Sequence, residues 1–277
     1  MPEITTAESF SGAELREAMV DAFSDYQIPL TLSQPAFDLM MKQRGLDRRH
    51  SRVAIVDGRV AAIWLMSLRD ERAYLISSGT RPTFRGRGLA KTLAQNCIAA
   101  LADIGVRSIQ LEVLRDNEKA IRLYQSIGMQ LRRRLDCYTV TARSGVRNDA
   151  DMSSVPWQLI ETEVANIRDW EPTWQNSDAS MRAIAGVLHC VALRDQHGLS
   201  GYVIAETTTA TLHQLAVRQD MRRRGVGRAL IGTLLSRLNA PVLRLLNVQS
   251  DDQSFRGLMQ CLDASETAGQ YELKMDL

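Results

Sequence analysis

The chain of 277 residues has little of what marks several specialised classes of protein. Aromatic residues make up 5% of it and its formal net charge is +2, so it lacks the basic excess and stacking side chains of a nucleic-acid binder. No apolar run approaches the roughly 18 residues of a membrane span. The first ten residues have neither the basic nor the apolar part of a signal peptide. These absences predict a cytoplasmic protein that binds neither nucleic acid nor membrane.

Cysteine is also scarce. The chain has four cysteines and no Cys-x-x-Cys pair, so we expect reduced thiols and no metal site. Apolar residues at 45% and charged residues at 24% are ordinary for a globular protein. The length leaves room for two domains, each with a core of its own.

The sequence does contain a stretch rich in glycine and arginine at residues 80–93, between an apolar run and a helical pattern. Gly86 and Gly88 lack a Cβ, so the backbone can turn tightly there and approach a ligand closely. A helix that begins at this point presents unpaired N–H groups and the positive end of its dipole. Arg85 and Arg87 add positive charge. Together these features predict a binding site for a phosphate or pyrophosphate group.

The same pattern occurs again at residues 217–230, after another apolar run. Aligning Thr80 with Val217 places Arg85 on Arg222, Gly88 on Gly225, Ala90 on Gly227 and Leu93 on Leu230, which indicates an internal repeat. Lys91 occupies the third glycine position of a dinucleotide-binding motif, so we do not expect a nucleotide-binding enzyme. The second loop adds four residues to the predicted phosphate sites: Arg222, Arg224, Gly225 and Gly227.

The spacing Arg-x-x-Gly-x-Ala/Gly resembles the acyl-CoA-binding signature of the GNAT N-acetyltransferase superfamily. Residues 117–129 resemble that family's second motif, Asn-x-x-Ala-x-x-x-Tyr-x-x-x-Gly, with Tyr124 at the tyrosine position. The two motifs cover nearly all of the N-terminal half and, more weakly, the C-terminal half. The resemblance implies an N-acetyltransferase that uses acetyl-CoA as co-substrate and no metal ion. In the first copy it implies coenzyme contacts from Thr80, Arg85, Gly86, Arg87, Gly88, Leu89, Ala90 and Asn117.

The order of the predicted elements is that of a mixed α/β (α+β) fold. In each half, strands lead into the loop, and a helix, a strand, a second helix and a last strand follow. We expect two tandem GNAT-type domains whose sheets are mainly antiparallel and parallel only next to the loop. Their predicted limits are residues 1–143 and 157–277, with a polar linker at 144–156. Within the second domain we expect strands at residues 157–161 and 183–193.

Acyl transfer to an amine needs a base for the amine, polarisation of the thioester carbonyl and an acid for the departing thiolate. By resemblance, backbone N–H groups where residues 73–80 diverge from residues 109–114 polarise the carbonyl, as an oxyanion hole does. Tyr124 is the expected acid, because a phenol ordinarily stays protonated at neutral pH. Tyr74 stands where some family members carry a glutamate that acts as the general base. Glu112 and water are therefore the alternative bases here.

The second copy differs at positions where the first carries chemistry. Met259 aligns with Tyr124, and Asp263 aligns with Gly128. We therefore expect catalysis in the N-terminal domain and coenzyme binding with little turnover in the C-terminal one. The reverse assignment stays open, because His213 precedes the second loop and histidine can act as a base. A non-catalytic acyl-CoA sensor is the other alternative. The expected acceptor is a small-molecule or peptide amine.

Overall fold

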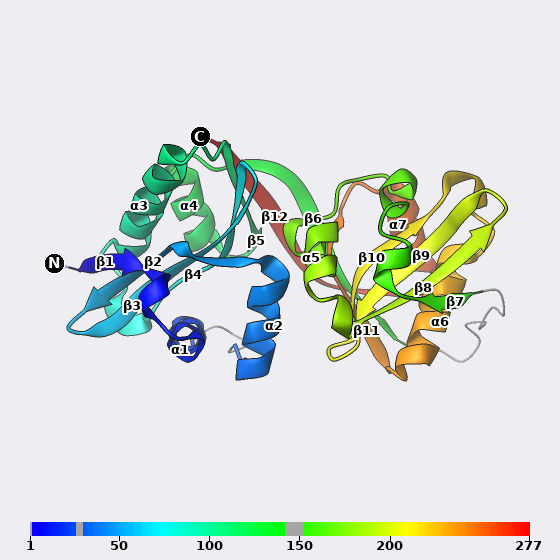
Figure 1. Cartoon of the computed structure of the whole chain (residues 1–277), viewed down its shortest axis with the longest axis horizontal. Coiled ribbons are helices and arrows are strands. Elements are labelled where there is room, and N and C mark those ends of the chain that lie inside the picture. The colour runs from blue at the N-terminus through cyan, green and yellow to red at the C-terminus, as the bar shows by residue number, and fades with distance from the viewer. Residues whose placement is uncertain (1, 26–29, 142–151) are drawn as a thin grey trace. The chain divides into compact units, whose positions relative to one another are not determined.

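The structure is a computed structural model that describes residues 2–25, 30–141 and 152–277. The chain divides into two compact units (Figure 1). Unit 1 comprises Met1–Arg132 and Tyr271–Leu277, and unit 2 comprises Arg133–Gln270. Most of the predicted linker, residues 144–151, lies outside the described residues. Within the described ranges, no helix combines the length and the apolar character that crossing a membrane would require.

Unit 1 has a sheet with the strand order β1-β2-β3-β4-β5-β12. Figure 1 shows α3 and α4 on one side of this sheet and α1 and α2 on the other. The strands are β1 (Glu3–Thr6), β2 (Leu46–Val56), β3 (Arg59–Arg69), β4 (Arg72–Thr80), β5 (Ser108–Leu114) and the end of β12 (Ser265–Asp276). The helices are α1 (Gly12–Ala22), α2 (Gln34–Arg44), α3 (Leu89–Asp103) and α4 (Glu118–Ser126).

Local sequence signals explain where several of these elements begin and end. Ser11 and Glu14 form the predicted capping box at the start of α1. Gly45 ends α2 in a left-handed conformation with φ 75°. Asp57 and Gly58, with φ of 51° and 72°, make the two-residue turn between β2 and β3, because that turn requires two positive φ angles.

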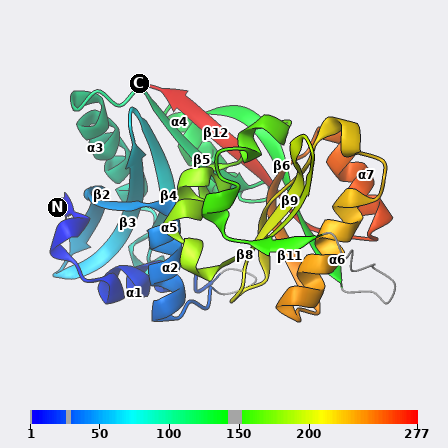
Figure 2. The ribbon, with the colours of Figure 1, turned by 45° about the vertical axis from the view of Figure 1, so that its right-hand side comes forward.

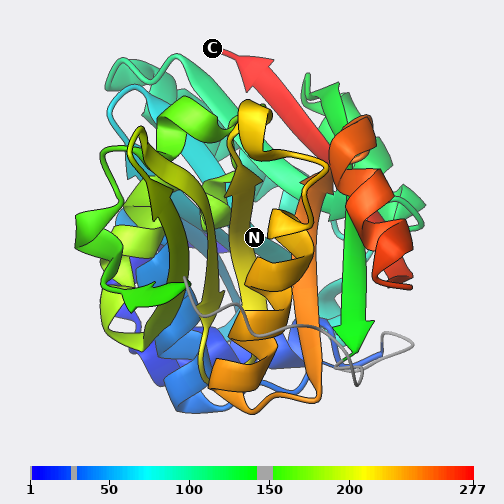
Figure 3. The same cartoon turned by 90° about the vertical axis from the view of Figure 1, so that its right-hand side faces the viewer.

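Unit 2 repeats the arrangement, with the strand order β6-β11-β10-β9-β8-β7. Helix α6 packs on β8, β9 and β10, and Figure 3 shows it lying across this face. The strands are β6 (Gln130–Thr141), β7 (Ser153–Val155), β8 (Leu188–Asp195), β9 (Gly198–Glu206), β10 (Thr211–Val217) and β11 (Val242–Gln249). The helices are α5 (Asp178–Ala183), α6 (Val226–Leu238) and α7 (Gln253–Cys261).

Parallel pairing is confined to the strands that flank the first helix after each loop. In unit 1 it joins β4 to β5 and ends with Tyr74 opposite Gln110. In unit 2 it joins β10 to β11 and ends with Leu212 opposite Leu245. The other strand pairs with a known register are antiparallel. The predicted mixed α/β fold is therefore confirmed, with each parallel pair opening toward its loop.

A β-bulge interrupts the strand before each loop. The register between β3 and β4 shifts so that Ile76 is the extra residue. The register between β9 and β10 shifts so that His213 is the extra residue. The alignment of the two copies places Ile76 on His213, so the bulge occupies the same position in both units. Bulges of this kind redirect neighbouring side chains and increase the local twist.

Each unit is completed by a strand that, by its place in the sequence, would be expected to close the other unit. Residues 135–141 of β6 pair with β11 in unit 2, although they directly follow the elements of unit 1. The final residues of β12, from Tyr271 onward, belong to unit 1, where β12 neighbours β5. Figure 2 shows the red end of β12 in this position. The two units thus exchange their closing strands along the sequence.

Two predicted strands of the second half are wrong in extent. Residues 157–161 were expected to form a strand, but the structure has a 3₁₀ turn over Trp157–Leu159 and a strand over Ser153–Val155. Pro156 separates them because it has no N–H for a strand ladder. Residues 183–187 belong to the end of α5 and a further 3₁₀ turn, so β8 begins at Leu188.

Candidate functional site

The two glycine-rich loops have the same backbone conformation. Gly86 and Gly88 both have φ of 76°, and their aligned partners Arg223 and Gly225 have φ of 61° and 86°. A left-handed conformation costs glycine little, whereas for Arg223 it costs about 1 kcal/mol. The second copy keeps the turn despite this cost, which indicates that the backbone path itself is the shared feature.

Each loop ends at an open helix N-terminus. Gly88 is the N-cap of α3 and Gly225 is the N-cap of α6, and within the described ranges neither helix receives a side-chain capping bond. A Cβ built on Gly88 or Gly225 would meet nothing within 4 Å, so there is room beside the first turn. Unpaired N–H groups with free space beside them suit a phosphate. The geometry of both loops is therefore suited to a phosphate or pyrophosphate group.

The first arginine of each loop bonds a backbone carbonyl and an aspartate, and we call this set of contacts the loop brace. The Nε of Arg85 donates to the carbonyl of Thr80 at 3.1 Å, and its guanidinium binds both carboxylate oxygens of Asp25 at 2.5 and 2.8 Å. The hydrogen bonds from Arg85 hold the pKa of Asp25 below its usual value. Arg222 makes the same pair of contacts, to the carbonyl five residues earlier and to Asp169. No sequence motif marks either aspartate, so this brace was not predicted.

The remaining predicted loop residues lie around the helix starts. Arg87 and Arg224 are exposed, and the guanidinium of Arg87 lies 5.5 Å from the centre of the Phe84 ring. Leu89 is buried in the core of unit 1 and anchors α3. A Cβ on Gly227 would come within 3.1 Å of Leu258, so glycine lets α6 and α7 approach closely.

Tyr124 reaches the point where β4 and β5 diverge. Asn117 caps α4 by accepting a hydrogen bond from the N–H of Ala120 at 3.1 Å, which fixes the start of this helix. The Tyr124 side chain is buried and packs edge-on against Trp64. Its hydroxyl lies 2.9 Å from the Oγ of Ser78, two residues beyond the bulge of β4. The structure thus places the predicted acid beside the part of β4 that lies beyond the parallel ladder.

Glu112 lies on the opposite face of the same sheet. The residues that alternate with it on β5, Ile109, Leu111 and Val113, belong to the core that also contains Tyr124. The hydroxyl of Tyr74 donates a hydrogen bond to the carboxylate of Glu112. Burial, reinforced by the charge of Glu112, raises the pKa of Tyr74 well above its usual value, so Tyr74 remains a donor. Tyr124, the candidate acid, and Glu112, the candidate base, therefore lie on opposite faces of the sheet at β5.

Unit 2 has different side chains at these positions. Counting from the parallel ladders, Leu246 takes the place of Glu112. Met259, which takes the place of Tyr124, is buried in the unit 2 core. The polar side chain here is instead His213, whose Nδ1 lies 3.0 Å from the Oδ1 of Asn176.

A cavity of about 630 Å³ lies within unit 2. The loop, β10, β11 and α7 all contribute to its wall, and His213 is one of the lining residues. Near the loop the wall also includes Trp170, whose Nε1 donates to Asp252, the N-cap of α7, at 3.0 Å. The described residues contain no group of three or more histidine, cysteine, aspartate or glutamate side chains that could hold a metal ion.

Comparison with known families gives two matches along the chain. The family described as "Acetyltransferase (GNAT) family" matches residues 14–129 and again residues 153–261, which together make up well over half of the sequence. The chain is also similar to the [ribosomal protein bS18]-alanine N-acetyltransferase of Salmonella typhimurium, with 36% identity over 72 residues. That match covers 26% of this chain and spans 49%, about half, of the relative.

Solved structures share the fold over the full length. A tandem GNAT protein from the clavulanic acid biosynthesis pathway has a TM-score of 0.74 at 13% identity, covering 100% of this chain and 98% of its own. A GCN5-related N-acetyltransferase from Sphaerobacter thermophilus has a TM-score of 0.72 at 16% identity, covering 99% of this chain and 95% of its own. At these identities the likeness concerns the fold alone, and it confirms the tandem arrangement.

Proposed function

Because the chain belongs to the GNAT family of acetyltransferases, we propose that it transfers the acetyl group of acetyl-CoA to the amine of a small molecule or a peptide. The observation that carries this proposal is the combination found in unit 1. An open helix N-terminus at Gly88 stands at one end of β4. The buried hydroxyl of Tyr124 lies 2.9 Å from the Oγ of Ser78, where β4 leaves β5.

The backbone of residues 86–90 would hold the pyrophosphate of the coenzyme through the N–H groups of the first turn of α3. Arg87 is exposed next to this turn and supplies positive charge. Arg85 contributes indirectly, because its bonds to Asp25 and Thr80 keep the loop in shape. When bound, acetyl-CoA supplies an acyl group already activated as a thioester.

The two faces of the sheet divide the proton transfers. On one face, Glu112 takes a proton from the acceptor nitrogen as that nitrogen forms its bond to the acetyl carbon. Tyr74 holds this carboxylate in place by its hydrogen bond. On the other face, Tyr124 gives a proton to the sulfur as the carbon–sulfur bond breaks, and solvent restores it. The products are an amide and the free thiol of coenzyme A.

The acceptor is proposed by chemical class. The Salmonella typhimurium relative acts, by its name, on an alanine of a ribosomal protein, which supports a peptide amine as one class to test first. Small primary amines form the second class.

The direct test is thiol release from acetyl-CoA by the purified protein with a panel of acceptors. The panel contains free amino acids, polyamines and a peptide with an N-terminal alanine. We expect release that depends on one acceptor class and an acetylated product visible by mass spectrometry. Acetyl-CoA binding without release would favour a sensor, and a protein that neither binds nor consumes acetyl-CoA would contradict the proposal.

A further inference from the structure

Each parallel pair of strands diverges beyond its ladder, and we call the stretch where it does so the fork. The fork of unit 1 is flanked by polar side chains, of which Tyr124 and Ser78 lie 2.9 Å apart at their hydroxyl oxygens. The counterparts in unit 2 are all apolar, with Leu215 for Ser78, Leu246 for Glu112 and Met259 for Tyr124. The fork of unit 2 therefore offers hydrocarbon surface where the fork of unit 1 offers hydrogen-bonding groups.

Leu246 shows that this difference is not a simple enlargement of the core. Its side chain lines the cavity of unit 2 and is 36% exposed, whereas the preceding Leu245 is fully buried in the unit 2 core. Among the exposed large apolar side chains of the described ranges, Leu246 is the one that lines this cavity. An apolar group that packs on Leu246 would remove this surface from water, which is favourable.

The cavity joins the apolar fork to the phosphate loop. Residues 212–217 of β10 all line it, from the end of the ladder at Leu212 to the end of the strand at Val217. At about 3.3 Å per residue, this stretch spans roughly 16 Å. The apolar lining comes from both strands and from α7: Leu212, Leu215, Leu245, Leu246, Val248, Phe255 and Leu258.

The end of the cavity at the loop is cationic. Arg223 and Arg228 line it beside Gly225, the N-cap of α6, and both arginine side chains are exposed. Positive charge at an open helix N-terminus suits a phosphate group. The cavity thus has a cationic end and an apolar end, which matches the polarity of a coenzyme A thioester with a hydrocarbon acyl chain.

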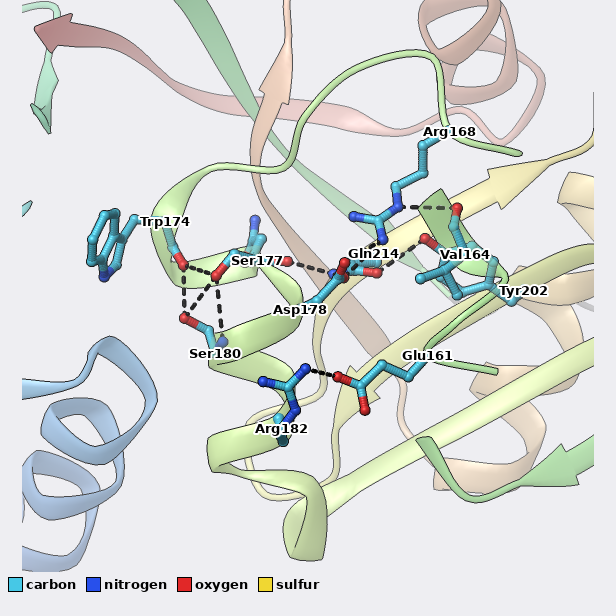
Figure 4. Close-up of polar contacts among 11 residues, drawn as sticks. Glu161, Val164, Arg168, Trp174, Ser177, Asp178, Ser180, Arg182, Tyr202 and Gln214 are labelled. Carbon is cyan, nitrogen blue, oxygen red and sulfur yellow. Dashed lines mark hydrogen bonds and ion pairs between the residues drawn. The ribbon is translucent and has the colours of Figure 1, made fainter. Parts of the chain in front are cut away.

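Three polar residues of the cavity wall, Arg168, Tyr202 and Gln214, are already bonded within the protein (Figure 4). Arg168 binds both carboxylate oxygens of Asp178 at 2.7 and 2.8 Å. The Nε2 of Gln214 donates to the same carboxylate at 3.1 Å, and the hydroxyl of Tyr202 donates to the Oε1 of Gln214 at 3.0 Å. Because these groups have partners inside the protein, they do not select for a polar acyl group.

Asn176 fixes the spacing of the two strands at the fork of unit 2. Its Nδ2 donates to the carbonyl of Leu246 on β11 at 2.9 Å, and its Oδ1 lies 3.0 Å from the Nδ1 of His213 on β10. Asn176 is 3% exposed, and the Nε2 of Gln214 donates to its backbone carbonyl at 2.6 Å. The fork is therefore held at one width before a ligand binds, which lowers the cost of binding.

We propose that unit 2 binds an acyl-CoA whose acyl group is an aliphatic chain longer than acetyl. The phosphates lie at the loop, and the chain lies at the fork against Leu215 and Leu246. This inference rests on the proposed function, because it requires that the loops bind coenzyme A, and it assigns the two units different acyl groups. It concerns binding alone, so no bond of the ligand forms or breaks.

Calorimetry with acetyl-, butanoyl-, hexanoyl- and octanoyl-CoA tests this inference. In Gly88→Glu, which blocks the loop of unit 1, the affinity should rise about fourfold for each added methylene until the fork is filled, as burial of a hydrocarbon chain requires. In Gly225→Glu, which leaves only the loop of unit 1, the affinity should change by less than about threefold along the series, because that fork is polar.

Leu246→Gln in the Gly88→Glu background should remove most of the dependence on chain length. Its affinity for acetyl-CoA should stay within about threefold of the parent, since acetyl adds little apolar surface, and this retained affinity would show that unit 2 is folded. The matched control is Leu159→Gln, because Leu159 is 62% exposed in the same unit and lies outside the cavity lining. It should leave the whole series unchanged.

Two further measurements locate the chain. Free octanoate should not bind to Gly88→Glu, and octanoyl-CoA should not bind to the double variant with Gly225→Glu. A flat series in Gly88→Glu, an equal rise in Gly225→Glu, an unchanged series after Leu246→Gln or binding of octanoyl-CoA by the double variant would overturn the inference. A protein that shows the rise in Gly88→Glu, and whose wild type releases no thiol from acetyl-CoA with any acceptor, would instead overturn the proposed function.

Discussion

At the level of single residues, the two copies carry chemically different side chains at equivalent positions. Unit 1 has Glu112 on β5 and Tyr124 on α4, and unit 2 has Leu246 and Met259 there. Unit 2 has His213 at its bulge instead of an apolar residue. Neither set of side chains can substitute for the other, so single substitutions should separate the contributions of the two units.

Tyr124→Phe tests the proposed acid of unit 1. In a Gly225→Glu background, which blocks the second loop, kcat should fall by about 10²–10⁴-fold with little change in KM for acetyl-CoA. In the proposed mechanism the phenol acts on the leaving sulfur in the transition state, so coenzyme affinity should not depend on it. The matched control is Met259→Leu at the aligned position, which should keep kcat within a few-fold. Equal effects of the two changes would count against the assigned role.

Cysteine reactivity reports on the cavity of unit 2. Burial raises the pKa of the Cys97 and Cys190 thiols to about 12, so they should resist alkylation at neutral pH. Cys261 is exposed and lines the cavity, so maleimide should modify it first. Acetyl-CoA should slow this modification, and Cys261→Ser should abolish the first adduct in the mass spectrum. An unchanged rate with saturating acetyl-CoA would place the coenzyme elsewhere.

At the level of elements, the loop brace makes stability depend on pH. Asp25 has a pKa below its usual value because Arg85 binds its ionised form. The unfolded value is about 3.9, so this contribution is complete above that pH and disappears as the pH falls through the lower folded value. Asp25→Asn should therefore be less stable than the wild type at pH 6, and the difference should vanish toward pH 2.

Urea unfolding at several pH values measures this difference. The exposed Asp103→Asn, at the end of α3, is the control and should follow the wild type throughout. A difference between Asp25→Asn and the wild type that stays constant from pH 6 to pH 2 would show that the Asp25–Arg85 pair is not its source.

The elements show which parts of the molecule local sequence can predict. The loop geometry follows from Gly86, Gly88 and Gly225, because the left-handed turn favours glycine at these positions. The β-bulges could not be predicted, because a bulge depends on the register of the partner strand. The contact of Asn176 with His213 joins residues 37 positions apart that no motif connects. Sequence therefore predicted the conformation of the glycine loops and the place of Tyr124 on a helix, whereas only tertiary structure shows the contact between His213 and Asn176.

At the level of the whole molecule, the shared geometry of the two loops leads us to predict two coenzyme sites. Calorimetry with acetyl-CoA should give two sites for the wild type and one for either Gly88→Glu or Gly225→Glu. Each new carboxylate repels phosphate and occupies the space beside the helix N-terminus, while a left-handed position disfavours any side chain. The double variant should bind nothing. One site in the wild type that only Gly88→Glu removes would leave unit 2 without a coenzyme.

The exchange of closing strands predicts that neither half of the sequence is a complete domain. Leu273 on β12 is 2% exposed and belongs to the core of unit 1. The buried Glu272 beside it accepts hydrogen bonds from Arg132 at 3.0 Å and from Gln110 at 3.4 Å. Deleting residues 271–277 removes these contacts and leaves the edge of β5 unpaired. The deletion should therefore unfold unit 1, although its own repeat up to residue 132 is intact.

Leu273→Ala provides a graded form of the same test. Truncating a buried leucine typically costs about 2–5 kcal/mol, so the transition that reports on unit 1 should shift to lower temperature or urea concentration. Trp64 in unit 1 offers a fluorescence probe for that transition, because it lies in the same core as Leu273. The control is Leu277→Ala, whose side chain is 40% exposed and should change the transition little. A chain that ends at residue 141 lacks β12. If this chain unfolded at the same temperature as unit 1 of the wild type, β6 and not β12 would close unit 1, and the exchange of closing strands would be contradicted.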